Sequence, residues 1–424
     1  MMTTPSRPAE FITRDEARYL TLFAQRIETV EPRGTRLPTT EHLLDLVHQI
    51  SVIQLDSISV VSRAHETSVW TRVGTFKTSD FSILHHPKAA LFEYWVHAAS
   101  LVPIQFFPYV RRQMESHATA TTRWGRWGAE NKDLLQSVLA TIEKQGAVST
   151  RAFERPEEIK RSPWAWFGGK PAKEALDFLW TAGELVVIKR EGFERHYDLT
   201  DRTFPGARSG PLPSLEDQNR FFIERALRSV GIGTLPWLAD FFRPGSSRYV
   251  SANDAKAVLN SLEQVGRAIP VLIESIAAPA WLDESLLPVL DAFRTGALRS
   301  RAKTLLSPFD NVMWRRNRAL ALWGFDYRIE TYTPEPLRAY GYYSLPILID
   351  GRFVGRLDPR YHRKEKLLSI KSIHLEPGIR TNARLVSAIA SVLRKFTEFL
   401  GGGEIQILES NPEALKSLLN QKLR

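Results

Sequence analysis

The sequence contains no cysteine among its 424 residues. Disulfide bonds, a thiolate nucleophile, and zinc or iron–sulfur sites built on cysteine are therefore excluded. No apolar stretch is long enough to span a bilayer. The segment from Met1 to Glu10 is polar and lacks the apolar centre of a signal peptide. These absences fit a reducing compartment, and we expect a soluble, cytoplasmic protein without a membrane partner.

The familiar catalytic signatures are also missing. The chain has no Gly-x-Ser-x-Gly, no His-Glu-x-x-His, no Walker loop and no dinucleotide fingerprint. The pair His85-His86 stands before Pro87, and neighbouring imidazoles point apart in regular structure. A surface loop explains this pair better than a metal site does. We therefore predict no metal and no cofactor.

The positive charge of the chain is concentrated near its end. The formal net charge is +10 and the pI is about 9.7. From Ser285 to Arg424 there are 23 basic and 13 acidic residues, so this segment holds the whole excess. Such an imbalance indicates either a polyanionic partner, most often nucleic acid, or a solvated surface.

Helices followed by two-stranded ribbons recur along the chain. Ribbons are predicted at Ala90–Trp95 with Ala98–Pro103, and at Leu185–Lys189 with His196–Leu199; a third strand is predicted at Ala268–Ile276. Helices followed by a ribbon are the order of a winged helix. We therefore predict a disordered tail (1–12), winged helices at 13–125, 126–206 and 215–284 with a linker at 207–214, and a basic β-rich domain (285–424).

The last third alternates apolar and polar residues with a period of two, which is typical of an antiparallel sheet or small barrel. The expected strands are Tyr327–Tyr332, Ser344–Asp350, Arg352–Leu357 and Leu368–Leu375. A closing helix is predicted over 384–400, and the three glycines from Gly401 are predicted to end it. The predicted fold class is α+β: tandem winged helices followed by a C-terminal β-rich domain with a closing helix.

The most informative stretch begins at Ser51 and ends at His65, where a buried strand leads into a helix. Gln54 and Asp56 are two positions apart, so on a strand they point to the same side, while Leu55 points to the other. Two polar groups beside an apolar strand need partners. They belong either to a local turn, in which Asp56 or Ser57 caps the next helix, or to a working site.

Basic residues that could contact phosphates lie near this pair and in the last third. Each cluster alone is compatible with a solvated surface, and together they form a plausible backbone-binding face. Trp70 and Trp95 are predicted as core residues rather than base-stacking platforms. The candidate DNA contacts are Arg63, His65, Arg72, Arg299, Arg301, Lys303, Arg315, Arg316, Arg318, Arg363 and Lys364.

Several motifs together resemble the AlkZ/YcaQ (AlkX) family of bacterial DNA glycosylases. They cover nearly the whole chain after its N-terminal tail. The motifs are Gln54-Leu-Asp-Ser-Ile with Val-Val-Ser-Arg-Ala-His after it, Glu93-Tyr-Trp-Val-His97, Ser307-Pro-Phe-Asp-Asn-Val-Met-Trp314, Tyr327-Arg-Ile-Glu330, Tyr340-Gly-Tyr, Leu345-Pro and Gly355-Arg-Leu-Asp358.

The resemblance implies tandem winged helices, a β-rich C-terminal domain, removal of alkylated purines and unhooking of interstrand crosslinks. It makes Gln54 and Asp56 the catalytic pair. The Gln-x-Asp form is similar to the YcaQ (AlkX) branch rather than the Gln-x-Gln branch, which implies broad alkyl adducts instead of one toxin. The implied partner is damaged double-stranded DNA in the bacterial nucleoid, with no obligatory protein partner.

Two side chains, Gln54 and Asp56, are enough for hydrolysis of this glycosidic bond. Guanine alkylated at its ring nitrogen seven is already cationic, so no general acid is needed to protonate it before it leaves. Asp56 can stabilise the oxocarbenium-like sugar and orient or deprotonate water, and Gln54 can hold the water or the sugar. No lysine is near the motif, so a lyase step is not indicated. The alternatives are a non-catalytic winged-helix DNA binder, such as a transcriptional regulator, and a scaffold for nucleic-acid processing.

Overall fold

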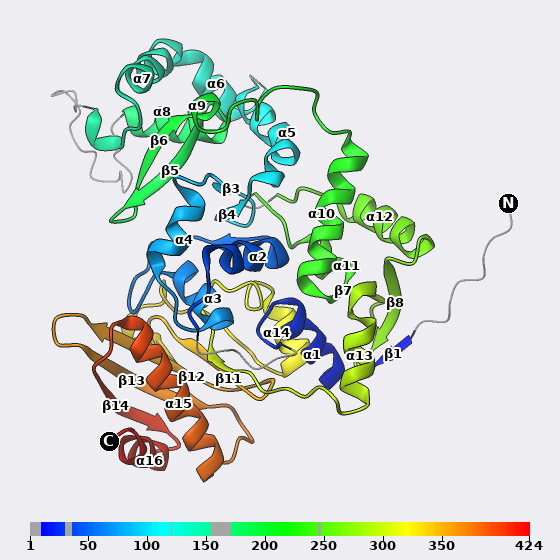
Figure 1. The fold of residues 1–424 in the computed structure, drawn as a ribbon, viewed down its shortest axis with the longest axis vertical. Coiled ribbons are helices and arrows are strands. Elements are labelled where there is room, and N and C mark those ends of the chain that lie inside the picture. Colours follow the sequence, from blue (N-terminus) through cyan, green and yellow to red (C-terminus); the bar gives the residue numbers. More distant parts are fainter. Residues whose placement is uncertain (1–9, 30–35, 120, 154–170, 245–246) are drawn as a thin grey trace, which may run out of the picture. The chain divides into compact units, whose positions relative to one another are not determined.

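A computed structural model of the chain describes residues 10–29, 36–119, 121–153, 171–244 and 247–424. The structure is α+β, as predicted, with helices along most of the chain and a five-stranded sheet near its C-terminus (Figure 1). Two compact units divide it: Met1–Thr78 with Phe222–Arg424, and Ser79–Phe221. In the part of the chain described here, no helix has the length and apolar character needed to cross a membrane.

The unit Ser79–Phe221 contains two antiparallel ribbons. One pairs β3 (Leu91–Trp95) with β4 (Ala99–Pro103), and the other pairs β5 (Leu185–Glu191) with β6 (Glu194–Leu199). Both ribbons are where the alternating pattern placed them. The helices of this unit are α4 (Thr78–His85), α5 (Phe107–Ala118), α6 (Arg123–Glu130), α7 (Lys132–Gln145), α8 (Pro171–Thr181) and α9 (Thr200–Thr203), with η1 (Ile104–Phe106) and η2 (Thr150–Ala152).

Glu93 joins the two ribbons from the interior. Its buried carboxylate accepts hydrogen bonds from Arg190 at 2.6 and 2.8 Å and from Arg195 at 3.0 Å. Burial raises the pKa of Glu93, but these arginines more than offset that effect and lower it overall. The ribbons of the first two predicted winged helices thus share one compact unit, so the predicted boundary at 125/126 does not coincide with a boundary between units.

A four-stranded sheet in the other unit includes the start of the described chain. Strand β1 (Glu10–Ile12) pairs in parallel with β8 (Ala268–Ile273), and β8 pairs antiparallel with β9 (Ala280–Asp283), which pairs with β7 (Ile232–Thr234). The expectation of a disordered tail was wrong for residues 10–12, because their backbone is paired; residues 1–9 lie outside the described residues.

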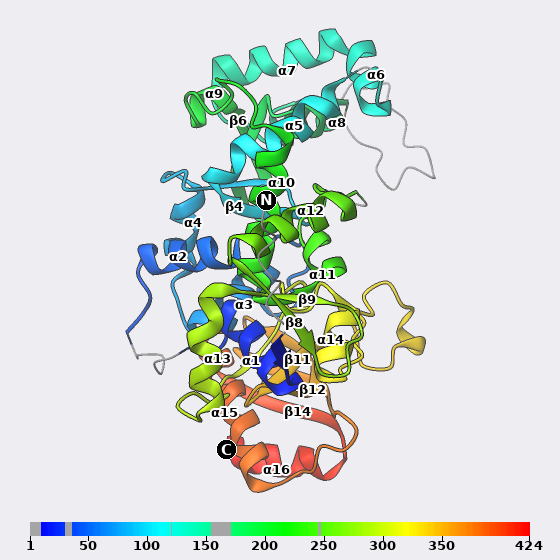
Figure 2. The ribbon, with the colours of Figure 1, turned by 90° about the vertical axis from the view of Figure 1, so that its right-hand side faces the viewer.

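Apolar side chains cover this four-stranded sheet and form one of the cores. They come from the strands and from α1 (Arg14–Ala24), α13 (Leu287–Arg294) and α14 (Arg316–Trp323), and Figure 2 shows α1 and α13 side by side. Further helices of this unit are α2 (Thr40–Ile50), α3 (Ala64–Val73), α11 (Leu235–Ala239) and α12 (Ala252–Gln264), with η3 (Glu284–Leu286) and η4 (Glu335–Leu337). Helix α10 (Leu215–Val230) belongs to this unit from Phe222 onward.

The five-stranded sheet of the last third runs in the order β10-β11-β12-β13-β14. Its first four strands are antiparallel neighbours, whereas β14 pairs in parallel with β13. The strands are β10 (Lys303–Leu305), β11 (Leu345–Ile349), β12 (Arg352–His362), β13 (Leu367–Leu375) and β14 (Glu404–Asn411).

Helix α15 (Ala383–Leu400) buries Leu385, Ile389, Leu393 and Phe396 and packs beside α16 (Ala414–Leu423) (Figures 1 and 2). Phe396 also contacts Trp70, with ring centroids 4.7 Å apart, so the core assignment of Trp70 is confirmed.

The predicted strand Tyr327–Tyr332 was wrong. This segment is irregular, because its polar groups bind the loop before β11 instead of a neighbouring strand. The Tyr327 hydroxyl donates to the carbonyl of Ser344 at 2.6 Å. Glu330 accepts the backbone N–H groups of residues 339–341 at 2.8 to 3.1 Å.

Candidate active site

Gln54 ends the short strand β2 (Ile53–Gln54), and Asp56 follows two positions later, ahead of helix α3. Ile53 and Leu55 are buried, whereas Gln54 and Asp56 are both partly exposed. This alternation is what a common orientation of the two polar side chains produces on an extended backbone. The amide and the carboxylate are therefore both partly accessible to solvent, in the unit that also holds the five-stranded sheet.

The carboxylate of Asp56 is tied at one oxygen. Its Oδ1 accepts the N–H of Ile58 at 2.8 Å, which closes a local turn. In the described chain, Oδ2 has no hydrogen-bond donor. Helix α3 begins at Ala64 with Arg63 in the N-cap position, so neither Asp56 nor Ser57 caps it. The prediction that Asp56 or Ser57 caps this helix is wrong, although Asp56 does close a local turn through Oδ1.

Burial also alters the acidity of this group. Partial burial raises the pKa of Asp56, while the hydrogen bond from Ile58 and the positive charge of Arg63 oppose the rise. The Arg63 guanidinium itself donates to the carbonyl of Ser57, on the same turn. A higher pKa makes Asp56 a stronger base than a fully solvated aspartate, which suits a group that takes a proton from water.

The strand that carries the pair is held by the segment Ser307–Trp314. The side-chain amide of Asn311 donates to the carbonyl oxygens of Ile50 and Val52 at 3.2 and 3.0 Å. Asn311 is itself buried. A buried amide that uses both donors on one short backbone stretch fixes that stretch in position. The motif Ser307–Trp314 therefore has a structural role beside the candidate site.

The preceding residue of that segment fixes helix α3. Asp310 accepts hydrogen bonds from Arg72 at 2.5 and 3.0 Å, and neither side chain is exposed. Arg72 also donates to the backbone and side chain of Gln25 at 2.8 Å. The prediction that Arg72 contacts DNA was wrong, because its guanidinium is enclosed and fully used within the protein.

The loop before β11 is the third support around the site. Asp358 on β12 accepts the N–H groups of Tyr342 and Tyr343 at 3.1 and 3.0 Å. Gly341, which precedes Tyr342, has φ +117°, and an added Cβ would lie 2.1 Å from the Asp358 carboxylate. Only glycine allows so close an approach. The Tyr340-Gly-Tyr and Gly-Arg-Leu-Asp motifs are therefore two halves of one contact.

Tyr343 lies at the inner end of this loop. Its buried hydroxyl is 3.3 Å from the Ser307 hydroxyl. Burial raises the pKa of Tyr343, and the negative charge of Asp56 raises it further. This phenol thus stays protonated beside the candidate base.

The predicted DNA contacts fall into three groups. Arg318 is 1% exposed and donates to the carbonyl of Asn311 at 2.8 Å, so the prediction for Arg318 was wrong. Arg315 is partly exposed and pairs with Asp240 at 2.5 Å. The others are partly or fully exposed: Arg63, His65, Arg299, Arg301, Lys303, Arg316, Arg363 and Lys364.

The chain is similar to known proteins over most of its length. The structure superposes on the DNA glycosylase AlkZ of Streptomyces sahachiroi with a TM-score of 0.62 at 15% sequence identity, covering 94% of this chain and all of that one. At this identity the match shows the fold alone. The family model described as DNA glycosylase AlkZ-like matches residues 47–399, which include β2, the Ser307–Trp314 segment and the sheet up to β13. The chain therefore belongs to the AlkZ-like DNA glycosylase family and is a DNA-binding hydrolase of N-glycosyl bonds.

Proposed function

We propose that this glycosylase removes alkylated purines, 7-alkylguanine above all, and that it unhooks interstrand crosslinks made through such bases. One observation carries the proposal: the Asp56 carboxylate is reachable from solvent and keeps Oδ2 without a hydrogen-bond donor in the described chain, beside Gln54. We also infer from the Gln-x-Asp form, which resembles that of the YcaQ (AlkX) branch, that the enzyme accepts a broad range of alkyl adducts.

The reaction needs no acid at the base. Alkylation of ring nitrogen seven gives the purine a positive charge, so it departs with the electron pair of the bond between C1′ and N9. The sugar that remains resembles an oxocarbenium ion. A carboxylate nearby stabilises that charge, and Asp56 in its ionised form has this role.

Water completes the hydrolysis. The Asp56 Oδ2 accepts one proton of the water as its oxygen bonds to C1′, and the proton then passes to solvent. Gln54, on the same side of the strand, holds the water or the sugar through its amide. The products are a free alkylated base and an abasic site in an uncut strand, so the enzyme is monofunctional.

The exposed basic residues bind the DNA backbone in this proposal. Phosphate contacts fix the position of a duplex without reading its sequence, which suits an enzyme that searches for damage. A crosslinked base cannot swing fully out of the helix, so the site must accept it while it is still close to the duplex. The half-exposed position of Asp56 supports such an open arrangement.

The test follows free base released from duplex DNA that carries a single radiolabelled 7-methylguanine. Wild type should release the base and leave the strand intact until alkali is added. Asp56→Asn should lose about two to four orders of magnitude in the rate of release while keeping its affinity, and Gln54→Ala should lose a smaller part. Asp45→Asn, which removes an exposed carboxylate on α2, serves as the matched control.

Two outcomes would contradict the proposal. Unchanged release by Asp56→Asn would remove Asp56 from the mechanism. Tight, sequence-specific footprints by wild type, with no release above the enzyme-free background, would instead favour the transcriptional regulator.

A further inference from the structure

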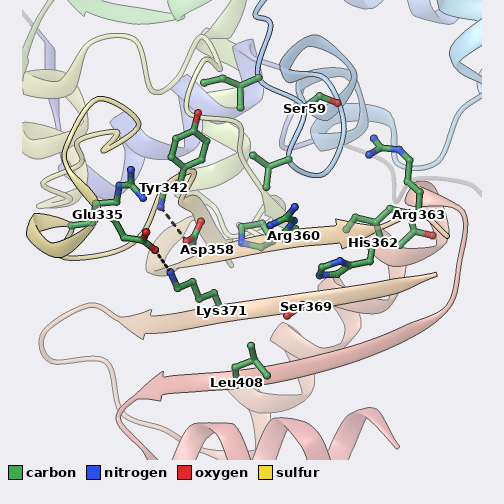
Figure 3. Close-up of a pocket in the computed structure, with 15 residues that line it drawn as sticks. Ser59, Glu335, Tyr342, Asp358, Arg360, His362, Arg363, Ser369, Lys371 and Leu408 are labelled. Carbon is green, nitrogen blue, oxygen red and sulfur yellow. Dashed lines mark hydrogen bonds and ion pairs between the residues drawn. The ribbon is translucent and has the colours of Figure 1, made fainter. Parts of the chain in front are cut away.

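A hollow of about 780 Å³ lies over β12 and β13 in the larger unit (Figure 3). Its lining comes from the loop after Asp56, the segment between α14 and β11, and strands β12, β13 and β14. This volume is within the range of about 300 to 1,000 Å³ that binding sites for small molecules occupy. It is large enough for one nucleotide.

The hollow lies next to the candidate active site, because residues that line it follow Asp56 in the chain and one of them is hydrogen-bonded to Asp56. Ile58 lines it, and the N–H of Ile58 is the donor that holds Asp56 Oδ1. The next residues of that loop are fixed to β12, because the N–H of Tyr361 donates to Val60 at 3.2 Å and the guanidinium of Arg363 donates to Val61 at 2.8 Å. A ligand in the hollow would therefore lie against the turn that carries the catalytic carboxylate.

The acidic groups of the lining are already used within the protein. Asp358 accepts two backbone N–H groups of the loop before β11. Glu335 pairs with Lys371 at 3.0 Å. Four cations face two anions in the lining, and both anions have protein partners.

Arg360 is the cation without a partner. It is exposed, and within the described residues its side chain makes no hydrogen bond or ion pair. Figure 3 shows it between Asp358 and His362 along β12. A guanidinium offers planar, paired donors that match the oxygens of a phosphate.

Tyr342 gives the hollow an aromatic wall. Its side chain is 39% exposed, although its backbone is held by Asp358. The guanidinium of Arg338 lies 5.1 Å from the centre of the Tyr342 ring. A half-exposed ring on a fixed backbone is a surface on which a base can stack, and stacking of this kind stabilises single-stranded nucleic acid.

We propose that this hollow binds a nucleotide of the damaged strand next to the lesion, with its phosphate on Arg360 and its base or sugar against Tyr342. The inference rests on the proposed function and deepens it by assigning a subsite beside the scissile bond. It explains how a duplex can be held at the site without burying the lesion itself. The ligand is recognised by a phosphodiester and a π face, so no particular base is required.

The first experiment combines Arg360→Gln with single methylphosphonate substitutions, which remove the charge of one phosphate at a time. The duplexes carry a stable abasic-site analogue, and affinity is measured by fluorescence anisotropy. Neutralising one phosphate of the damaged strand near the lesion should weaken binding by wild type roughly tenfold, the scale of one charge-assisted contact. Arg360→Gln should weaken binding to the unmodified duplex by the same factor and lose all further response at that phosphate.

Arg380→Gln is the matched control, because Arg380 is also exposed but does not line the hollow. It should behave as wild type throughout. Additive effects of Arg360→Gln and of every methylphosphonate would overturn the proposal. A coupled phosphate on the complementary strand, or equal affinity of Arg360→Gln and Arg380→Gln, would overturn it too.

The second experiment places 2-aminopurine beside the abasic-site analogue. Stacking on Tyr342 should quench its fluorescence with wild type and Tyr342→Phe, and Tyr342→Ala should abolish that protein-induced quenching. Equal quenching by all three proteins would remove Tyr342 from the subsite. Release of 7-methylguanine by wild type is measured in parallel, so a failure of the subsite is distinguished from a failure of the glycosylase reaction.

Discussion

The guanidinium of Arg72 and the carboxylate of Asp310 form a fully enclosed pair, joined by hydrogen bonds of 2.5 and 3.0 Å. The pair ties helix α3 to the segment that also holds strand β2. Arg72→Met should therefore destabilise the protein by about 3 to 5 kcal/mol, because it leaves a buried carboxylate without its partner. Urea denaturation measures this loss.

The double variant Arg72→Met with Asp310→Leu serves as its control. Removing both charges should recover much of the stability lost in Arg72→Met alone. The single variant Asp310→Leu completes the comparison. If the stability lost in the double variant equals the sum of the losses in Arg72→Met and Asp310→Leu, the two residues do not act as a pair.

The pH dependence of base release should follow Asp56. The carboxylate acts in its ionised form, so the single-turnover rate should fall as the pH falls through the pKa of Asp56. Burial raises that pKa above its ordinary value, so the loss should begin at a higher pH than for a solvated carboxyl group. Single-turnover rates measured at a series of acid to neutral pH values, with the rate of spontaneous depurination subtracted at each, check this expectation.

Arg63 provides an internal check on that assignment. Its positive charge lowers the pKa of Asp56, so Arg63→Gln should move the acid limb of the profile to higher pH. Any weaker DNA binding in this variant is removed by working at saturating enzyme. An unmoved midpoint would mean that another group governs the profile.

Asp56→Asn should be more stable than wild type at neutral pH. Since the pKa of Asp56 is raised on folding, its contribution to stability is most favourable below the unfolded pKa and is lost as pH rises past the folded one. Asparagine pays no such cost and still accepts the N–H of Ile58. We expect Asp56→Asn to melt at a higher temperature than wild type at neutral pH, and this difference should become smaller as the pH is lowered. A lower melting temperature than wild type at neutral pH would contradict the prediction.

Gly341→Ala should distort the loop before β11. Its Cβ would lie 2.1 Å from the Asp358 carboxylate, whereas a Cβ on Gly378, which also has positive φ, would meet no atom within 4 Å. Both changes carry backbone strain of about 1 to 3 kcal/mol, but only Gly341→Ala adds a clash. Thermal denaturation should show the larger loss for Gly341→Ala, together with slower base release. Equal losses of stability in Gly341→Ala and Gly378→Ala would show that the Asp358 side chain can move away from the added Cβ at no cost in stability.

Local pattern predicted the ribbons and the longest strands well. Asp350 and Gly351 both have positive φ, as a two-residue hairpin turn requires, and β11 and β12 flank them. Strand β14 was missed because it follows a run of three glycines and pairs in parallel with β13, a partner that the local sequence does not indicate. Its weak alternation of buried and exposed residues gave no further signal.

The site divides in the same way. The alternation of apolar and polar residues predicted that Gln54 and Asp56 are more accessible than Ile53 and Leu55, and the structure has this pattern. The sequence could not separate buried arginines from exposed ones, because the partner of Arg72 lies 238 positions away. One feature of the sequence does indicate a buried ion pair. Asp310, in Ser307-Pro-Phe-Asp-Asn, is a carboxylate close to apolar residues, and a carboxylate that becomes buried needs a cation as its partner. Arg360 and Tyr342 were missed as a pair because only the folded sheet brings them to one hollow.

The hold of Asn311 on the backbone at Ile50 and Val52 has a consequence for synthesis in the cell. These contacts join residues 261 and 259 positions apart. A ribosome exposes the reactive strand early, but the amide that steadies it emerges only after most of the chain has been translated. Under the proposed mechanism, a chain that ends before the Ser307–Trp314 segment lacks the contacts that hold the backbone ahead of Gln54, so we expect such a fragment not to excise bases.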